Sequence, residues 1–457
     1  MVQELNRENK MGTMQVNKLL LNMSLPMMVS MLVQALYNIV DSIFVAKVSE
    51  NALTAVSLAF PIQTLLIAVG TGTGVGVSSL LSKQLGEKDF KGVNKTAMNG
   101  IFLAAMSYIG FFILGLLAVK PFYASQVKNT ADPEIMNMGI AYLSIICMAS
   151  FGLCAQLILE KLLQATGKTF YSMIAQATGA IVNIVLDPIL IFGLCGFPAM
   201  GVAGAAVATI IGQIAGAAIA LYYNLARNHE IKLSIKGFCP DGQTIAKIYK
   251  VGVPTIIMQA IGSIMTYGMN LILIGFSSTA TAVFGVYFKL QSFFFMPVFG
   301  LNNGLIPIVA YNYGAGKRKR VLAAIKDSYL FAFLLLFCGF IAFESVPQTL
   351  LSLFDASPDM LAIGVPALRI IGIHFLVAWF CIVSSACFQA LGNGVYSMIV
   401  SVARQLVVLL PAAFILSKLG GLAAVWWAFP IAEIMSLLLS STFMLTINKT
   451  IIRNIPE

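Results

Sequence analysis

The chain has 457 residues, of which 59% are hydrophobic and only 10% are charged. Soluble proteins carry about 25% charged residues, so this composition, with a mean hydropathy of +0.90, excludes a soluble globular protein. The net charge of +10 does not indicate nucleic-acid binding, because the basic residues lie between hydrophobic runs and do not form the base-reading patch that this function needs. The length fits a single polytopic membrane domain.

Twelve apolar stretches, each long enough to cross a bilayer as a helix, follow one another along the chain. The first six lie near residues 19–46, 53–82, 97–119, 139–160, 170–195 and 200–223. The other six lie near residues 251–276, 281–311, 327–346, 361–388, 395–416 and 421–447. We expect the first stretch to be a retained helix, because no short apolar core with a small-residue cleavage site precedes it.

The distribution of basic residues predicts the orientation. Lys and Arg accumulate in the cytoplasmic loops of membrane proteins. With a cytoplasmic N-terminus, 21 of the 28 Lys and Arg residues fall on the cytoplasmic side and four fall outside. The remaining three lie within apolar stretches and are Lys289, Arg369 and Arg404. We therefore predict a multi-pass protein of the cell membrane with both termini in the cytoplasm.

The two halves of the chain repeat one another. QATGKTFYSMI at residues 164–174 recurs as QALGNGVYSMI at residues 389–399, with seven identities in eleven positions. At an offset of 228 residues Pro26 meets Pro254, and each proline permits a helix to bend. Each half holds six stretches, so both halves enter the membrane in the same orientation. We predict an all-α fold of two parallel-repeat lobes, residues 1–223 and 251–457, joined by a cytoplasmic connection over 224–250.

Two acidic residues lie inside apolar stretches of the first half. Asp41 lies in LYNIVDSIFVA and Asp187 in VNIVLDPILIF, with Asn183 one turn before Asp187 on the same helix face. A charge at the centre of a membrane helix costs about 2.5 to 3.5 kcal/mol and therefore needs a partner or water. The residues are compatible with a proton or Na⁺ site, or with acids that pair with polar neighbours near the outer headgroups.

Three further charged residues in the second half allow more than one interpretation. Arg404 and Glu433 lie on the last two stretches, and we predict a structural ion pair between them, because a paired buried charge is tolerated better than a single one. Lys289 begins an aromatic stretch, where it either faces a cavity or contacts a backbone carbonyl.

Methionine and aromatic side chains could line a cavity for varied hydrophobic substrates, because methionine adapts its shape and aromatic rings attract cations. They are equally compatible with a surface that faces lipid. The residues that we predict to line a substrate cavity are Tyr37, Gln63, Met31, Gln259, Lys289, Phe293 and Met296.

The sequence gives no support for a nucleotide, a cofactor or enzyme chemistry. Gly167-Lys168-Thr169 resembles the end of a phosphate loop, but the motif needs a glycine where the chain has Leu162. Two histidines are too few for a histidine-based metal or haem site, and the cysteine spacing matches no metal knuckle. An ion gradient is therefore the expected energy source.

Several segments resemble the multidrug and toxic compound extrusion (MATE) family, and most closely its bacterial drug-exporting branch. They include LPMMVSMLVQALYNIVDSIFVA, NIVLDPILIFGL and RQLVVLLPAAFILSKLGGLAAVWWAFPIAE. The resemblance implies two six-helix lobes around a central cavity, in a prokaryotic inner membrane, and antiport of amphipathic or cationic compounds against H⁺ or Na⁺. The cation-site positions that it implies are Asp41, Asn183, Asp187 and Thr209. We expect the protein to function as a monomer.

Some relatives use carboxylates on helices seven and ten, where this chain has Gln259 and His374, which weakens a second-lobe cation site.

Two other functions are compatible with a membrane protein of this kind. A lipid-linked oligosaccharide flippase of the same superfamily would need several cavity cations for a pyrophosphate, and only Lys289, Arg369 and Arg404 could serve. A channel would conduct without coupling to a counter-ion.

Overall fold

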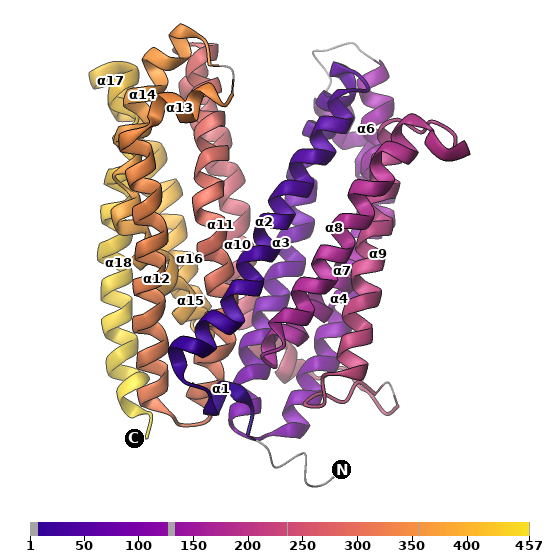
Figure 1. Cartoon of the computed structure of the whole chain (residues 1–457), viewed down its shortest axis with the longest axis vertical. Coiled ribbons are helices and arrows are strands. Elements are labelled where there is room, and N and C mark those ends of the chain that lie inside the picture. Colours follow the sequence, from indigo (N-terminus) through magenta and orange to yellow (C-terminus); the bar gives the residue numbers. More distant parts are fainter. Residues whose placement is uncertain (1–7, 127–132, 235, 355, 457) are drawn as a thin grey trace. The chain divides into compact units, whose positions relative to one another are not determined.

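The protein is helical throughout the part that the structure describes. The computed structural model covers residues 8–126, 133–234, 236–354 and 356–456, and in these ranges it contains helices and no strand (Figure 1). Ten of the described helices are long and apolar enough to cross a membrane, and two bent helix pairs raise the number to twelve if each pair is one span. The prediction of an all-α membrane fold with twelve spans is confirmed.

The helices group into two compact units. The first contains Val29–Ile256, and the second contains Lys10–Met28 and the chain from Ile257 onward. The first group of helices along the chain is α1 (Lys10–Thr13), α2 (Val16–Ala46), α3 (Glu50–Gly86), α4 (Phe90–Leu117), α5 (Val119–Gln126), α6 (Pro133–Met148), α7 (Phe151–Ala165), α8 (Thr169–Phe192) and α9 (Val202–Ala226). The remainder are α10 (Gly242–Ile274), α11 (Ser278–Gly314), α12 (Arg318–Ser345), α13 (Pro347–Ser352), α14 (Pro358–Gly372), α15 (Phe375–Ala390), α16 (Gly394–Val402), a π-helical segment (Ala403–Leu409), α17 (Leu410–Val425) and α18 (Ala428–Thr450).

The internal repeat of the sequence appears as pairs of matching helices in the two halves of the chain. Helices α3 and α11 both have 37 residues, and α4 and α12 both have 28. Ser49 caps α3 by accepting a hydrogen bond from the backbone N–H of Ala52 at 3.0 Å. Ser277 caps α11 in the same way through Ala280, also at 3.0 Å. Because a capping side chain satisfies a free backbone donor at a helix start, the repeated serines explain why both helices begin at equivalent positions.

Helices α2 and α10 each begin in one unit and continue in the other. The start of α10 packs on α3, where a Cβ atom at Gly76 would overlap the carbonyl oxygen of Ile248. The start of α2 packs on α11 at the equivalent place, where a Cβ atom at Gly304 would lie 3.0 Å from the Cα of Ser24. Each compact unit therefore includes one helix start from the other half of the sequence. The lobe boundaries at 1–223 and 251–457 remain a prediction.

Two pairs of helices are sharply bent at breaks that contain no proline. Helices α6 and α7 are bent by 45° at their break, and α14 and α15 by 52°. Pro26 and Pro254 instead lie inside the continuous helices α2 and α10. Each of these prolines lies within three residues of the point where its helix passes from one unit to the other, and a missing backbone hydrogen bond makes that point easy to bend.

The chain between α9 and α10 is tied to the start of α4. The backbone N–H of Lys232 donates to the side-chain oxygen of Asn94 at 2.7 Å, and Lys95 Nζ lies 3.0 Å from Asp241 Oδ2. Hydrogen bonds from Thr244 and Lys95 lower the pKa of Asp241 to about 2. Since this pKa lies below the ordinary value, the link persists at neutral pH and weakens only as the pH falls toward 2.

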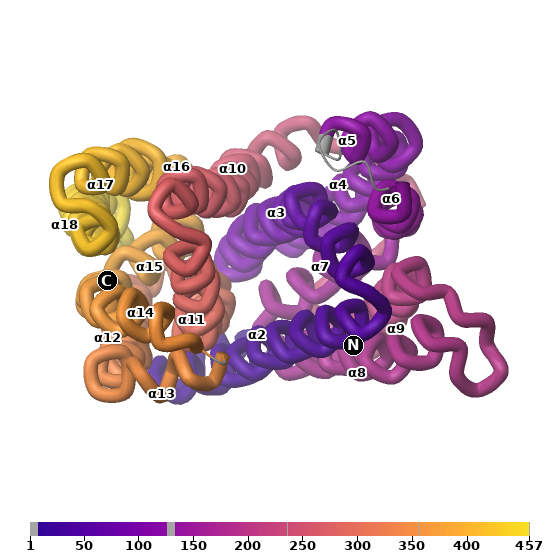
Figure 2. Tube along the Cα trace, turned by 90° about the horizontal axis from the view of Figure 1, so that it is seen from above, coloured from indigo at the N-terminus to yellow at the C-terminus, as the bar shows by residue number. Residues whose placement is uncertain are grey.

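Glycines bring the backbones of α8 and α9 together (Figure 2). A Cβ atom at Gly212 of α9 would lie 2.6 Å from the carbonyl oxygen of Gly179 on α8. Another at Gly204 would lie 2.5 Å from the carbonyl oxygen of Leu190. Small residues permit such close helix contact in membranes, and the contact places the polar side chains of α8 directly against α9.

We predict that Gly212→Ala lowers the stability of the protein, because the added methyl group must push the Gly179 carbonyl away. The expected cost is about 1 to 3 kcal/mol, as for other overpacked contacts, and the thermal unfolding midpoint in detergent measures it. The matched control is Gly110→Ala, since a Cβ atom there meets nothing within 4 Å. An unfolding midpoint of Gly212→Ala equal to that of the control would contradict the close α8–α9 contact.

Candidate functional site

A buried polar cluster lies between α8 and α9 in the first unit. Asn183 Nδ2 donates to Asp187 Oδ1 at 3.3 Å and to Thr209 Oγ1, also at 3.3 Å. Asp187 is fully buried and Asn183 is 3% exposed. The i, i+4 spacing places the two α8 side chains on one face, and the Gly179–Gly212 contact brings that face to Thr209. The structure therefore brings these three predicted positions together.

Helix α2 contributes a second acidic residue to this cluster. Asp41 interacts electrostatically with Asp187, and Tyr37, one turn earlier on α2, interacts with both carboxyl groups. Asp41 is partly exposed. Two carboxylates from different helices thus lie close enough to repel one another when both are ionised.

Gln63 and Tyr142 border the cluster from α3 and α6. Gln63 Nε2 donates to Tyr142 Oη at 2.8 Å, and Tyr142, which is buried, interacts electrostatically with Asp41 and Tyr37. Gln63 was predicted as a cavity residue, whereas Tyr142 was missed. An isolated tyrosine in an apolar stretch carries no distinguishing pattern, so only the packing of α6 against α3 reveals it.

The cluster has more acceptors than donors. Asp41 Oδ1, Asp187 Oδ2 and Asn183 Oδ1 are all buried and have no hydrogen-bond partner. In the described part of the chain neither Asp41 nor Asp187 forms a salt bridge. Buried acceptors without donors are rare in proteins, and oxygen atoms of carboxylate, amide and hydroxyl groups are the ligands of hard cations. A proton or a small cation would satisfy these atoms.

The other predicted cavity residues divide between the units. Met31 lies on α2 in the first unit and is partly exposed. Gln259, Lys289, Phe293 and Met296 lie in the second unit, and Phe293 is 65% exposed. A cavity that combines both sets of residues stays a prediction.

The charged residues of the second unit have local partners. Lys289 Nζ lies 5.9 Å from the centre of the Phe354 ring, a cation–π contact. Arg404, on the π-helical segment, has its Nη1 atom 3.2 Å from Glu433 Oε2, and the Glu433 side chain is 3% exposed. His374 is buried, with its Nδ1 atom 2.6 Å from the carbonyl oxygen of Ile371.

Known proteins are similar to this chain in sequence and in fold. The sequence model of the MatE family matches residues 26–189 and 254–415. Multidrug export protein MepA of Staphylococcus aureus (strain MSSA476) is 28% identical over 426 residues, which cover 92% of this chain and 91% of that protein. The protein of the same name from Staphylococcus haemolyticus (strain JCSC1435) is 28% identical over 426 residues and is covered to 90%.

Two solved structures have nearly the same fold. The first, described as the outward-facing conformation of a multidrug resistance MATE family transporter of the MOP superfamily, has a TM-score of 0.90 at 25% identity and covers 97% of this chain and 99% of its own. The second, described as MATE in the straight conformation, has a TM-score of 0.90 at 25% identity and covers 97% and 100%.

We predict that Asp187→Asn raises the thermal unfolding midpoint of the purified protein at neutral pH and low Na⁺. The substitution removes a buried charge, and its amide oxygen can still accept the hydrogen bond from Asn183 Nδ2. Since a buried group without full hydrogen bonding costs roughly 1 to 3 kcal/mol, and a charged one more, we expect a gain of this size. The control is Glu87→Gln, an exposed acid that pairs with Lys83 at 3.6 Å and whose loss should change little. A lower midpoint for Asp187→Asn would show that the carboxylate stabilises the fold.

Proposed function

The chain belongs to the MatE family of membrane transporters, and from this premise we propose that it is a multidrug efflux antiporter, which exports amphipathic, mostly cationic compounds in exchange for H⁺ or Na⁺. The observation that carries the proposal is the buried cluster of Asp41, Asn183, Asp187 and Thr209, in which three acceptor atoms have no donor. The names of the Staphylococcus relatives support multidrug export as the function.

The coupling cation binds at the two carboxyl groups. Protonation of one carboxyl group, or Na⁺ bound between both, removes the repulsion between Asp41 and Asp187. Asn183 and Thr209 add an amide and a hydroxyl oxygen, which are suitable ligands for Na⁺ and suitable hydrogen-bond partners for a protonated acid. The same geometry therefore serves either ion.

Exchange follows from competition for negative charge. A cationic drug is attracted while the carboxylates are ionised, and it loses that attraction when a proton or Na⁺ neutralises them. Entry of the ion from outside therefore favours release of the drug, and loss of the ion to the cytoplasm restores affinity. The free energy available is about 2.3 kcal/mol for each charge moved through 100 mV, or about a fiftyfold concentration ratio.

Helix α2 connects the charge to a change in conformation. It carries Asp41 in the first unit and begins in the second unit. Pro26 lies two residues before the crossing at Met28 and removes a backbone hydrogen bond there. A change of charge at Asp41 therefore acts on a helix that belongs to both units and that bends easily between them.

The alternatives receive less support. A pyrophosphate-carrying lipid needs a cluster of cationic side chains, but the first-unit cluster offers acceptor atoms, and Lys289 and Arg404 have local partners. A channel needs no competition between ion and substrate, so a transport assay separates it from an antiporter.

We predict that reconstituted vesicles accumulate a fluorescent lipophilic cation when an opposing pH or Na⁺ gradient is imposed, because movement of the ion drives counter-movement of the drug. Asp41→Asn and Asp187→Asn should each reduce this uptake to the level of protein-free vesicles. Glu87→Gln, an exposed acid on the surface of the first unit, serves as the control and should transport like the wild type.

Unchanged transport in both aspartate variants would reject the coupling mechanism. Collapse of the ion gradient at the same rate with and without the drug would instead identify a channel. Running each gradient separately also decides between H⁺ and Na⁺.

A further inference from the structure

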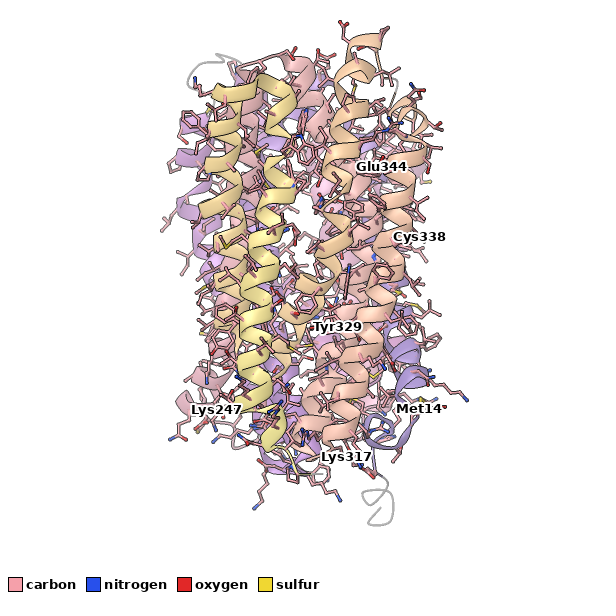
Figure 3. All side chains as sticks on the ribbon, turned by 90° about the vertical axis from the view of Figure 1, so that its left-hand side faces the viewer. Met14, Lys247, Lys317, Tyr329, Cys338 and Glu344 are labelled. Carbon is pink, nitrogen blue, oxygen red and sulfur yellow. The ribbon has the colours of Figure 1, made fainter. Side chains whose placement is uncertain are left out.

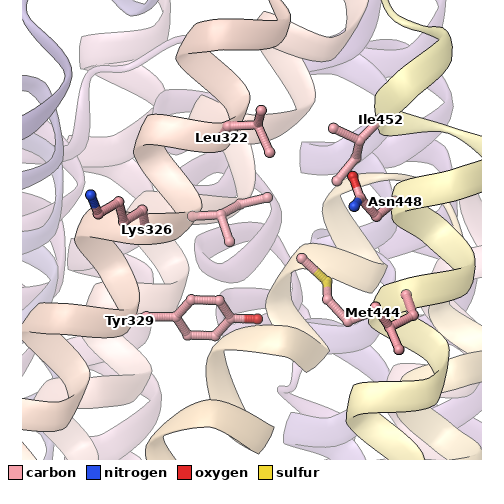
Figure 4. Close-up of a pocket in the computed structure, with 8 residues that line it drawn as sticks. Leu322, Lys326, Tyr329, Met444, Asn448 and Ile452 are labelled. Atoms are coloured by element: carbon pink, nitrogen blue, oxygen red, sulfur yellow. The ribbon is translucent and has the colours of Figure 1, made fainter.

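A groove opens in the second unit between the first turns of α12 and the last turns of α18 (Figure 4). Its volume is about 310 Å³. Six of the residues that line it are Leu322, Lys326 and Tyr329 from α12, Met444 and Asn448 from α18, and Ile452 just after α18. The walls are mostly hydrocarbon, and Figure 4 shows the Tyr329 hydroxyl directed toward α18.

Helix α15 forms the base of the groove. Helices α12 and α18 both pack against α15. Tyr329 stacks on the Phe380 ring of α15 with centroids 5.0 Å apart, and its hydroxyl lies 2.8 Å from Ser384 Oγ of the same helix. The ring contact and the hydrogen bond keep the Tyr329 side chain at the base of the groove. The groove is therefore a stable feature of the surface.

The position of the groove matches one leaflet of a bilayer. Figure 3 shows Lys317, Tyr329, Cys338 and Glu344 in order along the length of the unit, with the groove in the part between Lys317 and Tyr329. From the start of α12 at Arg318 to Tyr329 the helix rises by about 16 Å. The groove itself extends from Leu322 to Tyr329, a rise of about 10 Å. One leaflet of a bilayer has a hydrocarbon depth of about 15 Å, so the groove holds the part of an acyl chain that lies next to the headgroup.

The open end of the groove is basic. Residues 318–330 and 444–456 contain six basic residues and a single acid, Asp327. Lys319 and Lys326 share a helix face with Leu322, and Lys449 lies one turn beyond Leu445, which also lines the groove. These three lysines are exposed. The rim therefore attracts an anionic group and repels the cationic compounds that we propose as transport substrates.

The aligned place in the first unit is covered by that unit's own chain. The offset of 228 residues aligns Leu322 with Asn94 and Lys326 with Met98. Asn94 accepts a hydrogen bond from the backbone N–H of Lys232 at 2.7 Å, and Met98 is buried. The chain between α9 and α10 thus covers this face of α4, whereas the described residues of the second unit leave the matching face of α12 open.

We propose that the groove binds an anionic phospholipid, with one acyl chain between α12 and α18 and the phosphate at the rim formed by Lys319 and Lys449, where α12 begins and α18 ends. Burial of hydrocarbon against the apolar walls favours the chain. Basic residues near a membrane surface favour an anionic headgroup, and a zwitterionic headgroup lacks the net charge that the rim would attract. The lipid supplies the cover that the first unit obtains from its own chain.

Native mass spectrometry of the purified full-length protein tests the charge preference. Phosphatidylglycerol and phosphatidylcholine with the same acyl chains are added separately at equal concentration. The wild type should bind phosphatidylglycerol more tightly, and Lys319→Gln should weaken that binding by about fivefold without changing phosphatidylcholine binding. The matched control is Lys91→Gln, an exposed lysine at the start of α4 that the repeat aligns with Lys319.

A second variant tests the location. Leu322→Trp fills the groove and should abolish the preference for phosphatidylglycerol. Leu334→Trp, at a position on the same helix that is 48% exposed and lies outside the groove, should bind lipid like the wild type. Equal binding of both lipids by the wild type would overturn the proposal. A preference for phosphatidylglycerol that survives in Leu322→Trp, with the protein folded, would overturn it as well.

Discussion

The proposed mechanism depends on two carboxyl groups, Asp41 and Asp187, that form no salt bridge with any of the described residues. Asp187 is fully buried, and one of its oxygen atoms has no hydrogen-bond partner. An uncompensated charge in a low-dielectric interior costs several kcal/mol. A protein retains such a group only where a proton or a cation can relieve the cost. The second carboxyl group, Asp41, adds repulsion, which binding of a proton or a cation would relieve.

The helices around the site hold its two acidic residues in different ways. The contact between Gly179 and Gly212 fixes α8 against α9, so these two helices hold Asn183 and Asp187 in place. Helix α2 is different, because it extends from one compact unit into the other. In the mechanism that we propose, neutralising the two carboxyl groups removes the repulsion between this helix pair and α2, which carries Pro26 near its crossing point.

Much of this architecture is predictable from the sequence, and the part that is not depends on contacts between distant segments. The apolar stretches and the repeat predict the spans, and the i, i+4 spacing predicts that Asn183 faces Asp187. The sharp bends between α6 and α7 and between α14 and α15 are not predictable from proline positions, because packing sets them. Lys289 over Phe354 and the hydrogen bond from Gln63 to Tyr142 likewise need the folded neighbours.

The most direct test of the central claim is the equilibrium binding of a fluorescent lipophilic cation to the purified protein as Na⁺ or H⁺ is raised. We predict that one of these ions displaces the dye competitively from the wild type, and that Asp41→Asn and Asp187→Asn bind the dye weakly and without dependence on that ion. Dye affinity that is the same at every Na⁺ concentration and pH, or that is unchanged in both variants, would contradict the claim that ion and substrate compete for the two carboxylates.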